Sequence, residues 1–170
     1  MAIRRRSVRP QADTVDGTGR SPSARPAVPA TVTSRQWALP SDVHEIEPVV
    51  REIVSLCRAA GFSDRQCGLN VPVAVTEALA NAMLRGNRGE PGARVGLTVD
   101  ISAAGLVVEV ADQGTGFDLS AVEQSTAEAD WFEREDGRGV FLMRALMDRV
   151  ENACADGGAG HRLRLVLHRP

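Results

Sequence analysis

The stretch VTEALANAMLRGN, residues 75–87, decides how the chain is interpreted. Most of its residues are apolar, and its polar stripe consists of Glu77, Asn81 and Arg85 at positions i, i+4 and i+8. Side chains at this spacing lie on one face of an α-helix. Because a helix that is apolar elsewhere is buried, its polar stripe is expected to face something polar. The stretch therefore predicts a core helix that carries a polar site.

The chemistry of this stripe has two interpretations. A carboxylate and an amide one turn apart suit a hard cation such as Mg²⁺, which keeps water ligands and binds substrate phosphates. The Glu77 carboxylate could also orient or deprotonate an attacking hydroxyl group. The alternative is an amphipathic helix whose polar edge is simply solvated.

The sequence around this helix predicts an α/β domain. Apolar residues recur at helical spacing or alternate as in strands, with turn residues between them. The predicted helices are 43–60, 63–86 and 139–147, and the predicted strands are 36–39, 95–101, 106–111, 150–153 and 163–167. Ser63 and Gln66 have the spacing of a capping box at the start of the second helix. Adjacent hairpins favour a mixed, mainly antiparallel sheet with helices on one face, so we predict a two-layer α/β sandwich.

Two glycine motifs follow the second helix. DQGTGF, residues 112–117, comes directly after a predicted strand; its glycines allow close approach of the backbone to a ligand, and Asp112 can accept hydrogen bonds from an exocyclic amine. GRG, residues 137–139, opens the third predicted helix, where exposed N–H groups favour an anion and Arg138 could contact a phosphate. Each motif alone is more often an ordinary turn or an ordinary helix start.

Composition excludes several classes of protein. The 170 residues are 43% hydrophobic and 25% charged with a net charge of -2, which suits one soluble domain and gives no argument for nucleic-acid binding. We expect no membrane span, because no apolar run approaches about 20 residues. The three cysteines lack metal-ligand spacing and form a poor disulfide framework, so a reducing cytoplasm is the simplest compartment. All 20 basic residues are arginine, which excludes a lysine nucleophile and a P-loop lysine.

The N-terminal segment differs from the rest of the chain. The first 35 residues contain seven arginines and two aspartates among proline, serine, threonine, alanine and glycine. Such a segment has few large apolar residues to bury. We therefore predict a disordered basic tail over residues 1–34 and a folded domain over residues 35–170.

The three motifs in this order resemble those of the GHKL ATPase superfamily. EALANAMLRGN (77–87) is similar to its N-box, DQGTGFD (112–118) to its first glycine box, and GRGVFLMRALMDRVE (137–151) to its second glycine box. Within the superfamily, the text looks most like that of the anti-sigma-factor serine kinases. The resemblance spans about residues 35–167 and implies a Bergerat-type, histidine kinase-like ATP-binding fold.

The resemblance also implies roles for individual residues. Glu77 would position or activate the attacking hydroxyl group, Asn81 would be the Mg²⁺ ligand, and Asp112 would bind the adenine amino group. Residues 117–136 would form a mobile ATP lid. The other implied nucleotide-contacting positions are Arg85, Gly114, Gly116, Gly137, Arg138, Gly139 and Val140.

The implied function is a partner-switching kinase. The protein would bind ATP and Mg²⁺, bind a sigma factor or equivalent target, and phosphorylate a serine or threonine of a small STAS-type anti-anti-sigma protein. A cytoplasmic homodimer without direct nucleic-acid or membrane contacts is expected. Two positions depart from the family pattern: Arg85 stands where histidine is frequent, and His161 follows Gly160 where threonine is frequent.

Two alternatives remain. The first is an ATP-binding interaction module that transfers nothing. The second is the ATPase part of a histidine kinase, since HEIEP (44–48) is faintly similar to a phosphoacceptor box. Its proline spacing is one residue short, and we expect His44 to be a surface residue near a helix start.

Overall fold

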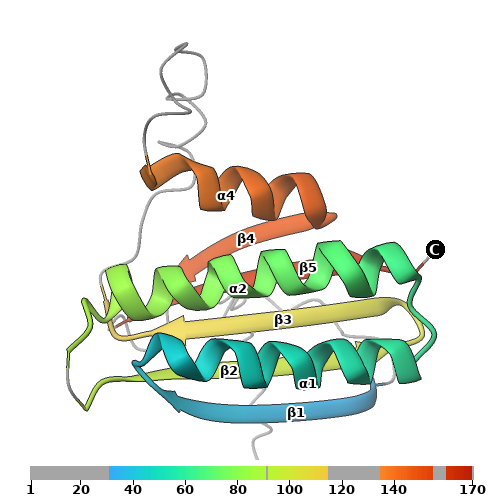
Figure 1. Cartoon of the computed structure of the whole chain (residues 1–170), viewed down its shortest axis with the longest axis horizontal. Helices are drawn as coiled ribbons and strands as arrows, with labels where there is room; N and C mark the ends of the chain where they lie inside the picture. The colour runs from blue at the N-terminus through green and yellow to red at the C-terminus, as the bar shows by residue number, and fades with distance from the viewer. Residues whose placement is uncertain (1–30, 91, 115–134, 155–159, 170) are drawn as a thin grey trace, which may run out of the picture.

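The computed structural model describes residues 31–90, 92–114, 135–154 and 160–169 (Figure 1). Within them, five strands form one sheet in the order β1-β2-β3-β5-β4, and every neighbouring pair is antiparallel. The strands are β1 (Thr31–Pro40), β2 (Arg94–Ser102), β3 (Gly105–Asp112), β4 (Arg149–Cys154) and β5 (His161–His168).

Three helices lie against one face of this sheet. They are α1 (Ile46–Ala59), α2 (Val71–Asn81) and α4 (Glu135–Leu146). A 3₁₀ turn, η1 (Val43–Glu45), precedes α1, and two π-helical turns, η2 (Gln66–Asn70) and η3 (Ala82–Gly86), extend α2 at both ends. Figure 1 shows all three helices on the same side of the strands, with α4 beside α2 and near β4. The predicted two-layer α/β sandwich is confirmed.

The core lies between the two layers. Alternate residues of β3 and β5 are buried, as the period of two in a strand requires. They pack with the buried face of α2 and with α4. Among the fully buried large side chains are Leu79, Met83, Leu106, Met143 and Leu165.

The long central helix is strongly apolar. Residues Gln66–Gly86 form a continuous helical run of 21 residues that is long and apolar enough, by length and composition, to cross a membrane. The expectation that no apolar run approaches the length of a membrane span is therefore wrong for these residues. A buried core helix passes the same test, and Val71, Val75 and Leu79 of this helix are 0% exposed in the domain core.

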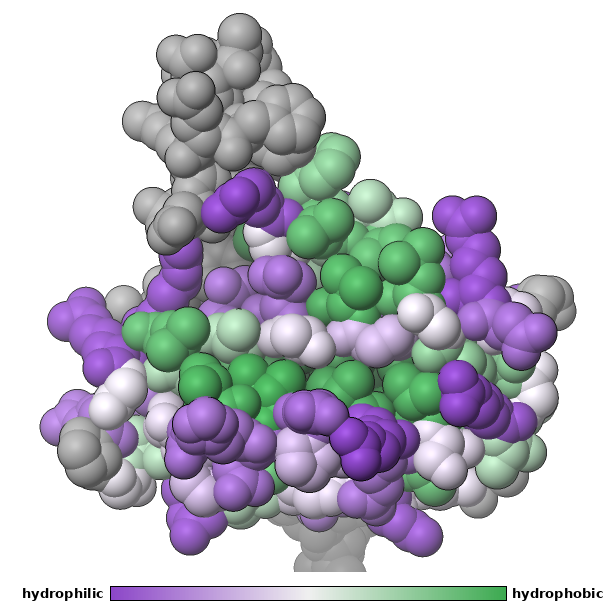
Figure 2. Space-filling model, in the orientation of Figure 1, coloured by the Kyte–Doolittle hydropathy of each residue, from purple (hydrophilic) through white to green (hydrophobic). Residues whose placement is uncertain are grey.

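Figure 2 shows the helical face of the molecule. Apolar side chains gather over α4 and between α1 and α2, and polar side chains surround them. The exposed large apolar residues include Leu84 and Phe141, at 59% and 45% exposure. The polar rim agrees with the amphipathic pattern of α1, where Glu47 and Arg51 form an exposed ion pair.

Two element boundaries differ from the predicted ones. Strand β1 begins at Thr31, because residues 31–35 pair with the far end of β2; the tail predicted over residues 1–34 is therefore wrong for residues 31–34, and residues 1–30 lie outside the described residues. Pro72 lies within the continuous helical run Gln66–Gly86, directly after the π-helical turn η2, and does not end it. The third helix begins at Glu135 rather than Gly139.

Candidate functional site

The polar stripe of α2 faces the start of α4. A Cβ atom placed on Gly139 would lie 2.6 Å from Glu77 Oε2 and 3.3 Å from Asn81 Nδ2. Real Cβ atoms are essentially never found at the shorter distance, so only glycine fits here without a shift. The structure therefore brings together Glu77, Asn81 and Gly139, which come from two separate motifs of the sequence.

The earlier start of α4 changes how its glycines act. Gly137 lies in the first turn, whose N–H groups have no intrahelical partner, whereas Gly139 lies beyond that turn. The prediction that Gly139 opens the helix is therefore wrong. Gly139 instead allows α4 to approach the α2 side chains closely. The neighbouring Arg138 is exposed, and Val140 is buried at 3% exposure.

Asp112 and the first glycine motif pack against the end of the same long helix. A Cβ on Gly86 would lie 2.4 Å from Asp112 Cγ, and a Cβ on Gly114 would lie 2.4 Å from the Gly86 carbonyl oxygen. The Gly114 N–H donates to Asp112 Oδ1 at 2.8 Å. These contacts hold the carboxylate at the junction of η3, β3 and the turn that follows β3.

The Asp112 carboxylate is buried and has a second side-chain partner. Strand alternation places Asp112 on the same inward face as Val110, and the residue is 8% exposed. His161 pairs with Asp112 across β3 and β5, and its Nδ1 lies 3.3 Å from Asp112 Oδ2. The sequence singled out His161 as a departure from the family pattern but gave no partner for it.

Comparison with known proteins identifies the family. A family model described as a histidine kinase-like ATPase domain matches residues 39–167. This chain belongs to the histidine kinase-like ATPase domain family. The predicted resemblance to that family is thus confirmed, and the match covers the three helices α1, α2 and α4 and the strands β2 to β5, but only the end of β1.

Individual proteins are similar to this chain over about half to three fifths of its length. The serine-protein kinase RsbW of Listeria monocytogenes serovar 1/2a is 33% identical over 117 residues, covering 61% of this chain and 74% of the relative. The serine-protein kinase RsbW of Listeria innocua serovar 6a is 32% identical over the same length. That of Oceanobacillus iheyensis is 32% identical over 87 residues, covering 48% and 55% of the two chains.

The donor set of this ATPase-family domain fits a nucleotide with a divalent cation. Asp112 offers a buried acceptor of the kind that an exocyclic amine requires. Glu77 and Asn81 offer carboxylate and amide oxygens beside the tight crossing at Gly139. The described residues contain no group of three or more histidine, cysteine, aspartate or glutamate side chains that could hold a metal ion. A Mg²⁺ ion that is held by one amide, phosphates and waters requires no such group.

One helix links the two ends of this site. Gly86 follows Asn81 by five residues, which corresponds to about 7 Å along a helix axis. In Figure 1 the C-terminal end of α2 lies beside the end of β3, and the N-terminal end of α4 lies nearby. The Glu77 cluster and the Asp112 cluster therefore lie at the same end of the domain.

Asn87 ends the N-box-like stretch 77–87, and no individual role was predicted for it from the sequence, although the structure makes it part of the site's framework. Asn87 is 5% exposed; its Oδ1 accepts the Gln113 N–H at 2.9 Å and its Nδ2 donates to the Arg94 carbonyl at 3.1 Å. It thereby ties the turn after β3 to the start of β2. The asparagine directly after the final glycine of the helix was the available signal in the sequence.

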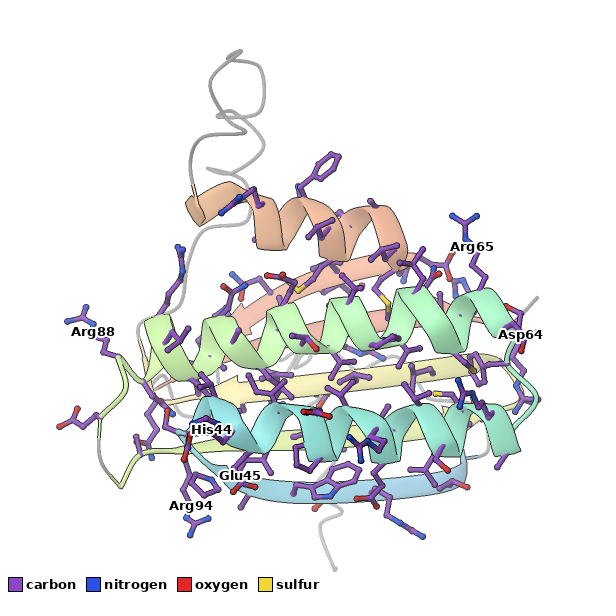
Figure 3. The ribbon with its side chains drawn as sticks, viewed as in Figure 1. His44, Glu45, Asp64, Arg65, Arg88 and Arg94 are labelled. Atoms are coloured by element: carbon purple, nitrogen blue, oxygen red, sulfur yellow. The ribbon has the colours of Figure 1, made fainter. Side chains whose placement is uncertain are left out.

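The remaining predicted residues lie at the rim or outside the described part of the chain. Arg85 is exposed, and the neighbouring Arg88, labelled in Figure 3, points away from the helices at the same end of the molecule. Gly116 and residues 117–134 of the predicted lid lie outside the described residues. Of that predicted segment, Glu135 and Asp136 belong to α4.

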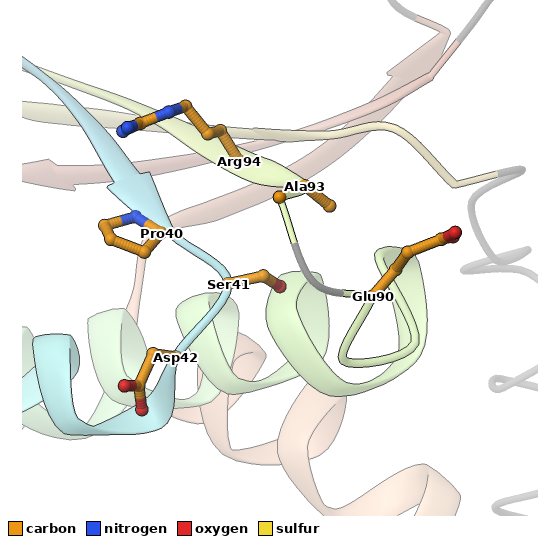
Figure 4. A pocket seen from close by; sticks show the side chains of 7 residues that line it. Pro40, Ser41, Asp42, Glu90, Ala93 and Arg94 are labelled. Atoms are coloured by element: carbon orange, nitrogen blue, oxygen red, sulfur yellow. The ribbon is translucent and has the colours of Figure 1, made fainter.

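A surface hollow of about 230 Å³ lies elsewhere, between the end of β1 and the turn before β2 (Figure 4). Its lining residues are Pro40, Ser41, Asp42, Glu90, Gly92, Ala93 and Arg94. None of the predicted site residues lines this hollow. Ser41 is occupied there in structural contacts, since its N–H donates to the Ala93 carbonyl and its hydroxyl to the Met83 carbonyl.

Proposed function

We propose that this protein binds ATP with Mg²⁺ and transfers the γ-phosphate to a serine or threonine of a partner protein. The observation that carries the proposal is the placement of Glu77 and Asn81 against Gly139, with Asp112 packed at the end of the same helix. The similarity to proteins named serine-protein kinase RsbW supports protein phosphorylation as the activity.

The base end of the proposed site is formed around Asp112. Its carboxylate would accept a hydrogen bond from the exocyclic amine of adenine, because an ionised carboxylate only accepts. Gly114 and Gly116 would allow the backbone to approach the base. The tight contact between Gly114 and Gly86 supports this assignment, since it fixes the orientation of the carboxylate.

The phosphate end of the proposed site is formed by α2 and α4. Asn81 would hold Mg²⁺, which supplies neutralisation of phosphate charge when it is bound. Gly137 would present the first-turn N–H groups of α4 to the phosphates, and Gly139 and Val140 would lie in the turn that follows. Arg85 and Arg138, both exposed at this end, would add positive charge.

Glu77 would act on the protein substrate. In the proposed transfer, the serine or threonine oxygen bonds to the γ-phosphorus, the bond from that phosphorus to the bridging oxygen of ADP breaks, and the hydroxyl proton passes to Glu77. The carboxylate is partly exposed and lies beside Gly139, where a hydroxyl group can approach. Phosphoryl transfer depends mainly on positioning and charge stabilisation, which this arrangement can provide.

The proposed partners follow from the family resemblance. The protein would bind a sigma factor or an equivalent regulator, and its substrate would be a small STAS-type anti-anti-sigma protein. We propose a cytoplasmic homodimer that regulates transcription through these partners. Phosphorylation of the antagonist would switch the kinase from one partner to the other.

The decisive experiment combines partner capture with detection of phosphate transfer. The tagged full chain is incubated with source lysate, Mg²⁺ and ATP, and mass spectrometry identifies bound proteins and new phosphoserine or phosphothreonine. Glu77→Gln keeps the size of the side chain beside Gly139 but removes the base. Glu52→Gln, at an exposed position of α1, is the matched control.

We expect wild type and Glu52→Gln to yield a small phosphorylated partner, and Glu77→Gln to bind the same partner without phosphorylating it. Equal recovery of partners with no phosphate from any variant would instead favour the ATP-binding interaction module. Phosphohistidine on the chain itself would favour the histidine kinase alternative.

A further inference from the structure

We propose that His161 is a positioning residue for Asp112 and that Asn152 extends this interaction to the edge strand β4. The three residues would form a relay that fixes the carboxylate for recognition of an exocyclic amine. This inference rests on the proposed ATP binding and deepens it. It concerns the histidine at a position where the family frequently has threonine.

Strand register brings the three residues together. Asp112 is the last residue of β3 and His161 the first residue of β5, and they face each other across the ladder. Asn152 pairs with Leu163, two residues further along β5, so it lies diagonally across the same face from His161. Gly160 has a φ of 96°, a conformation that favours glycine and turns the chain into β5 directly before His161.

The Asp112 carboxylate receives one protein partner on each oxygen. Oδ1 accepts the Gly114 N–H at 2.8 Å, and Oδ2 lies 3.3 Å from His161 Nδ1. The side chains of His161 and Asp112 are only 7% and 5% exposed. A buried carboxylate needs such partners, and an ionised one still has lone pairs left for an incoming amine.

The contact with Asn152 determines which nitrogen of His161 faces Asp112 as a donor. His161 Nε2 contacts the Asn152 side-chain amide. When the amide nitrogen of Asn152 faces Nε2, Nε2 accepts its hydrogen bond and the ring proton lies on Nδ1. In this tautomer, the His161 Nδ1–H donates to Asp112.

A histidine here differs from a threonine in reach and in rigidity. A hydroxyl group rotates and donates once, whereas the imidazole ring connects Asp112 to Asn152 on β4 in a fixed plane. Without the His161 donor, the Asp112 carboxylate would lose one of its two protein partners and could turn away from the base. A carboxylate that turns away presents no fixed acceptor, so the site would no longer prefer an amino group to a carbonyl group on the base.

The test measures nucleotide affinity of the full chain by calorimetry, with ATP and with inosine triphosphate, which carries a carbonyl group in place of the amine. His161→Ala removes the relay. His161→Asn places an amide nitrogen near the position of Nδ1 and retains the donor. His168→Ala is the matched control, because His168 lies on the same strand, is exposed, and interacts with Asp148.

We expect His161→Ala to weaken ATP binding about tenfold to a hundredfold, the range for a hydrogen bond to a charged group. His161→Asn should remain within about threefold of wild type by the same reasoning, and His168→Ala should equal wild type. The preference for ATP over inosine triphosphate should fall in His161→Ala. In an Asp112→Asn background, His161→Ala should cause no further loss, because the partner charge is already absent.

Two outcomes would overturn the inference. Wild-type affinity in both His161 variants would show that the contact with Asp112 is inconsequential. Losses that add fully to those of Asp112→Asn, with an unchanged base preference, would show that His161 acts only on the fold. If His161→Ala does not unfold cooperatively, its fold is impaired and its affinity is not informative. The inference is then tested by the ATP affinity and the base preference of His161→Asn. Failure of the wild type itself to bind ATP would instead contradict the proposed function.

Discussion

Gly139 of α4 contacts Glu77 of α2 so closely that a Cβ atom at position 139 would lie 2.6 Å from Glu77 Oε2. The contact joins the second glycine motif to the polar stripe of the core helix. The atom that a Cβ would meet, Glu77 Oε2, is the far end of a flexible side chain. The side chain of Glu77 can therefore move to relieve the clash, and the backbone of the domain need not shift. A methyl group at this position should therefore affect chemistry more than folding.

Gly139→Ala tests this relationship. We expect phosphate transfer to fall at least tenfold, because Glu77 is displaced, while the free energy of unfolding falls by no more than about 1 kcal/mol, the low end for overpacking. Gly68→Ala is the control, since a Cβ there would meet nothing within 4 Å. Chemical denaturation and a transfer assay check both values. Equal transfer rates in the two variants would contradict the placement of Glu77.

Gly114→Ala should behave differently, because the contacted atoms belong to the backbone. A Cβ there would lie 2.4 Å from the Gly86 carbonyl oxygen, which cannot move without shifting η3. We expect a loss of about 1–3 kcal/mol in the free energy of unfolding, together with weaker nucleotide binding. Gly96→Ala, where the nearest atom would be 3.7 Å away, provides the comparison in a strand. Equal stability of the two variants would argue against tight packing at Gly114.

Asp112→Asn should weaken ATP binding while leaving the fold intact. The amide oxygen can still accept the Gly114 N–H, but its nitrogen presents a donor to the donor of an adenine amine. Calorimetry measures the affinity, and circular dichroism with thermal unfolding checks the fold. Unchanged affinity would remove the assignment of Asp112 to base recognition.

Asn81→Ala should abolish the dependence of nucleotide binding on Mg²⁺. The substitution removes the one amide oxygen of the stripe and leaves Glu77 in place. ATP affinity is measured in the presence of Mg²⁺ and in the presence of a chelator, for the wild type and the variant. A metal dependence equal to that of the wild type would assign the ligand to another residue.

The two buried cysteines of the core, Cys57 and Cys67, should react slowly and should destabilise the fold at high pH. Burial, with a smaller contribution from Cys67, raises the pKa of Cys57 from 9.0 to about 12, and burial also raises the pKa of Cys67. A thiol whose pKa is higher in the folded state stabilises the fold below its unfolded pKa, and that contribution is lost as pH rises. The free energy of unfolding should therefore decrease between about pH 9 and 12.

Alkylation provides a second readout of the same property. Because the thiolate is the reactive form, iodoacetamide should label Cys57 and Cys67 in the native protein far more slowly than after denaturation. Cys57→Ala should reduce the decrease of stability at high pH. Rapid native labelling of Cys57 would contradict its burial.

Patterns of residues that are close together in the sequence predicted the helices and strands well. The capping box is present: the Ser63 N–H donates to Gln66 Oε1 at 3.1 Å, and the Gln66 N–H donates to Ser63 Oγ at 3.2 Å. Helical spacing placed Glu77 and Asn81 on one face, and the structure has both beside Gly139. These features depend on residues a few positions apart, which a sequence displays directly.

Contacts between residues far apart in the sequence could not be predicted from local sequence patterns. The extension of β1 to Thr31 depends on β2, and the pairing of Asp112 with His161 depends on the register of β3 and β5. Glycine motifs indicated close approach but not what is approached: Gly86 meets Asp112, and Gly139 meets Glu77. The start of α4 at Glu135 was missed because its first residues, EDGRG, contain two glycines, which weaken a helical pattern.

The π-helical turn η3 (Ala82–Gly86) directly follows Asn81. It changes the direction in which the residues at the end of the long helix face. In a regular helix each residue advances about 100° around the axis, whereas a wider turn accommodates one residue more. Glu77 and Asn81 can thus face α4 while the backbone of Gly86 faces the end of β3. Gain or loss of one residue in η3 would rotate one end of the site relative to the other. The relative orientation of Asn81 and Gly86 therefore depends on the number of residues in this turn, as well as on the side chains beside it.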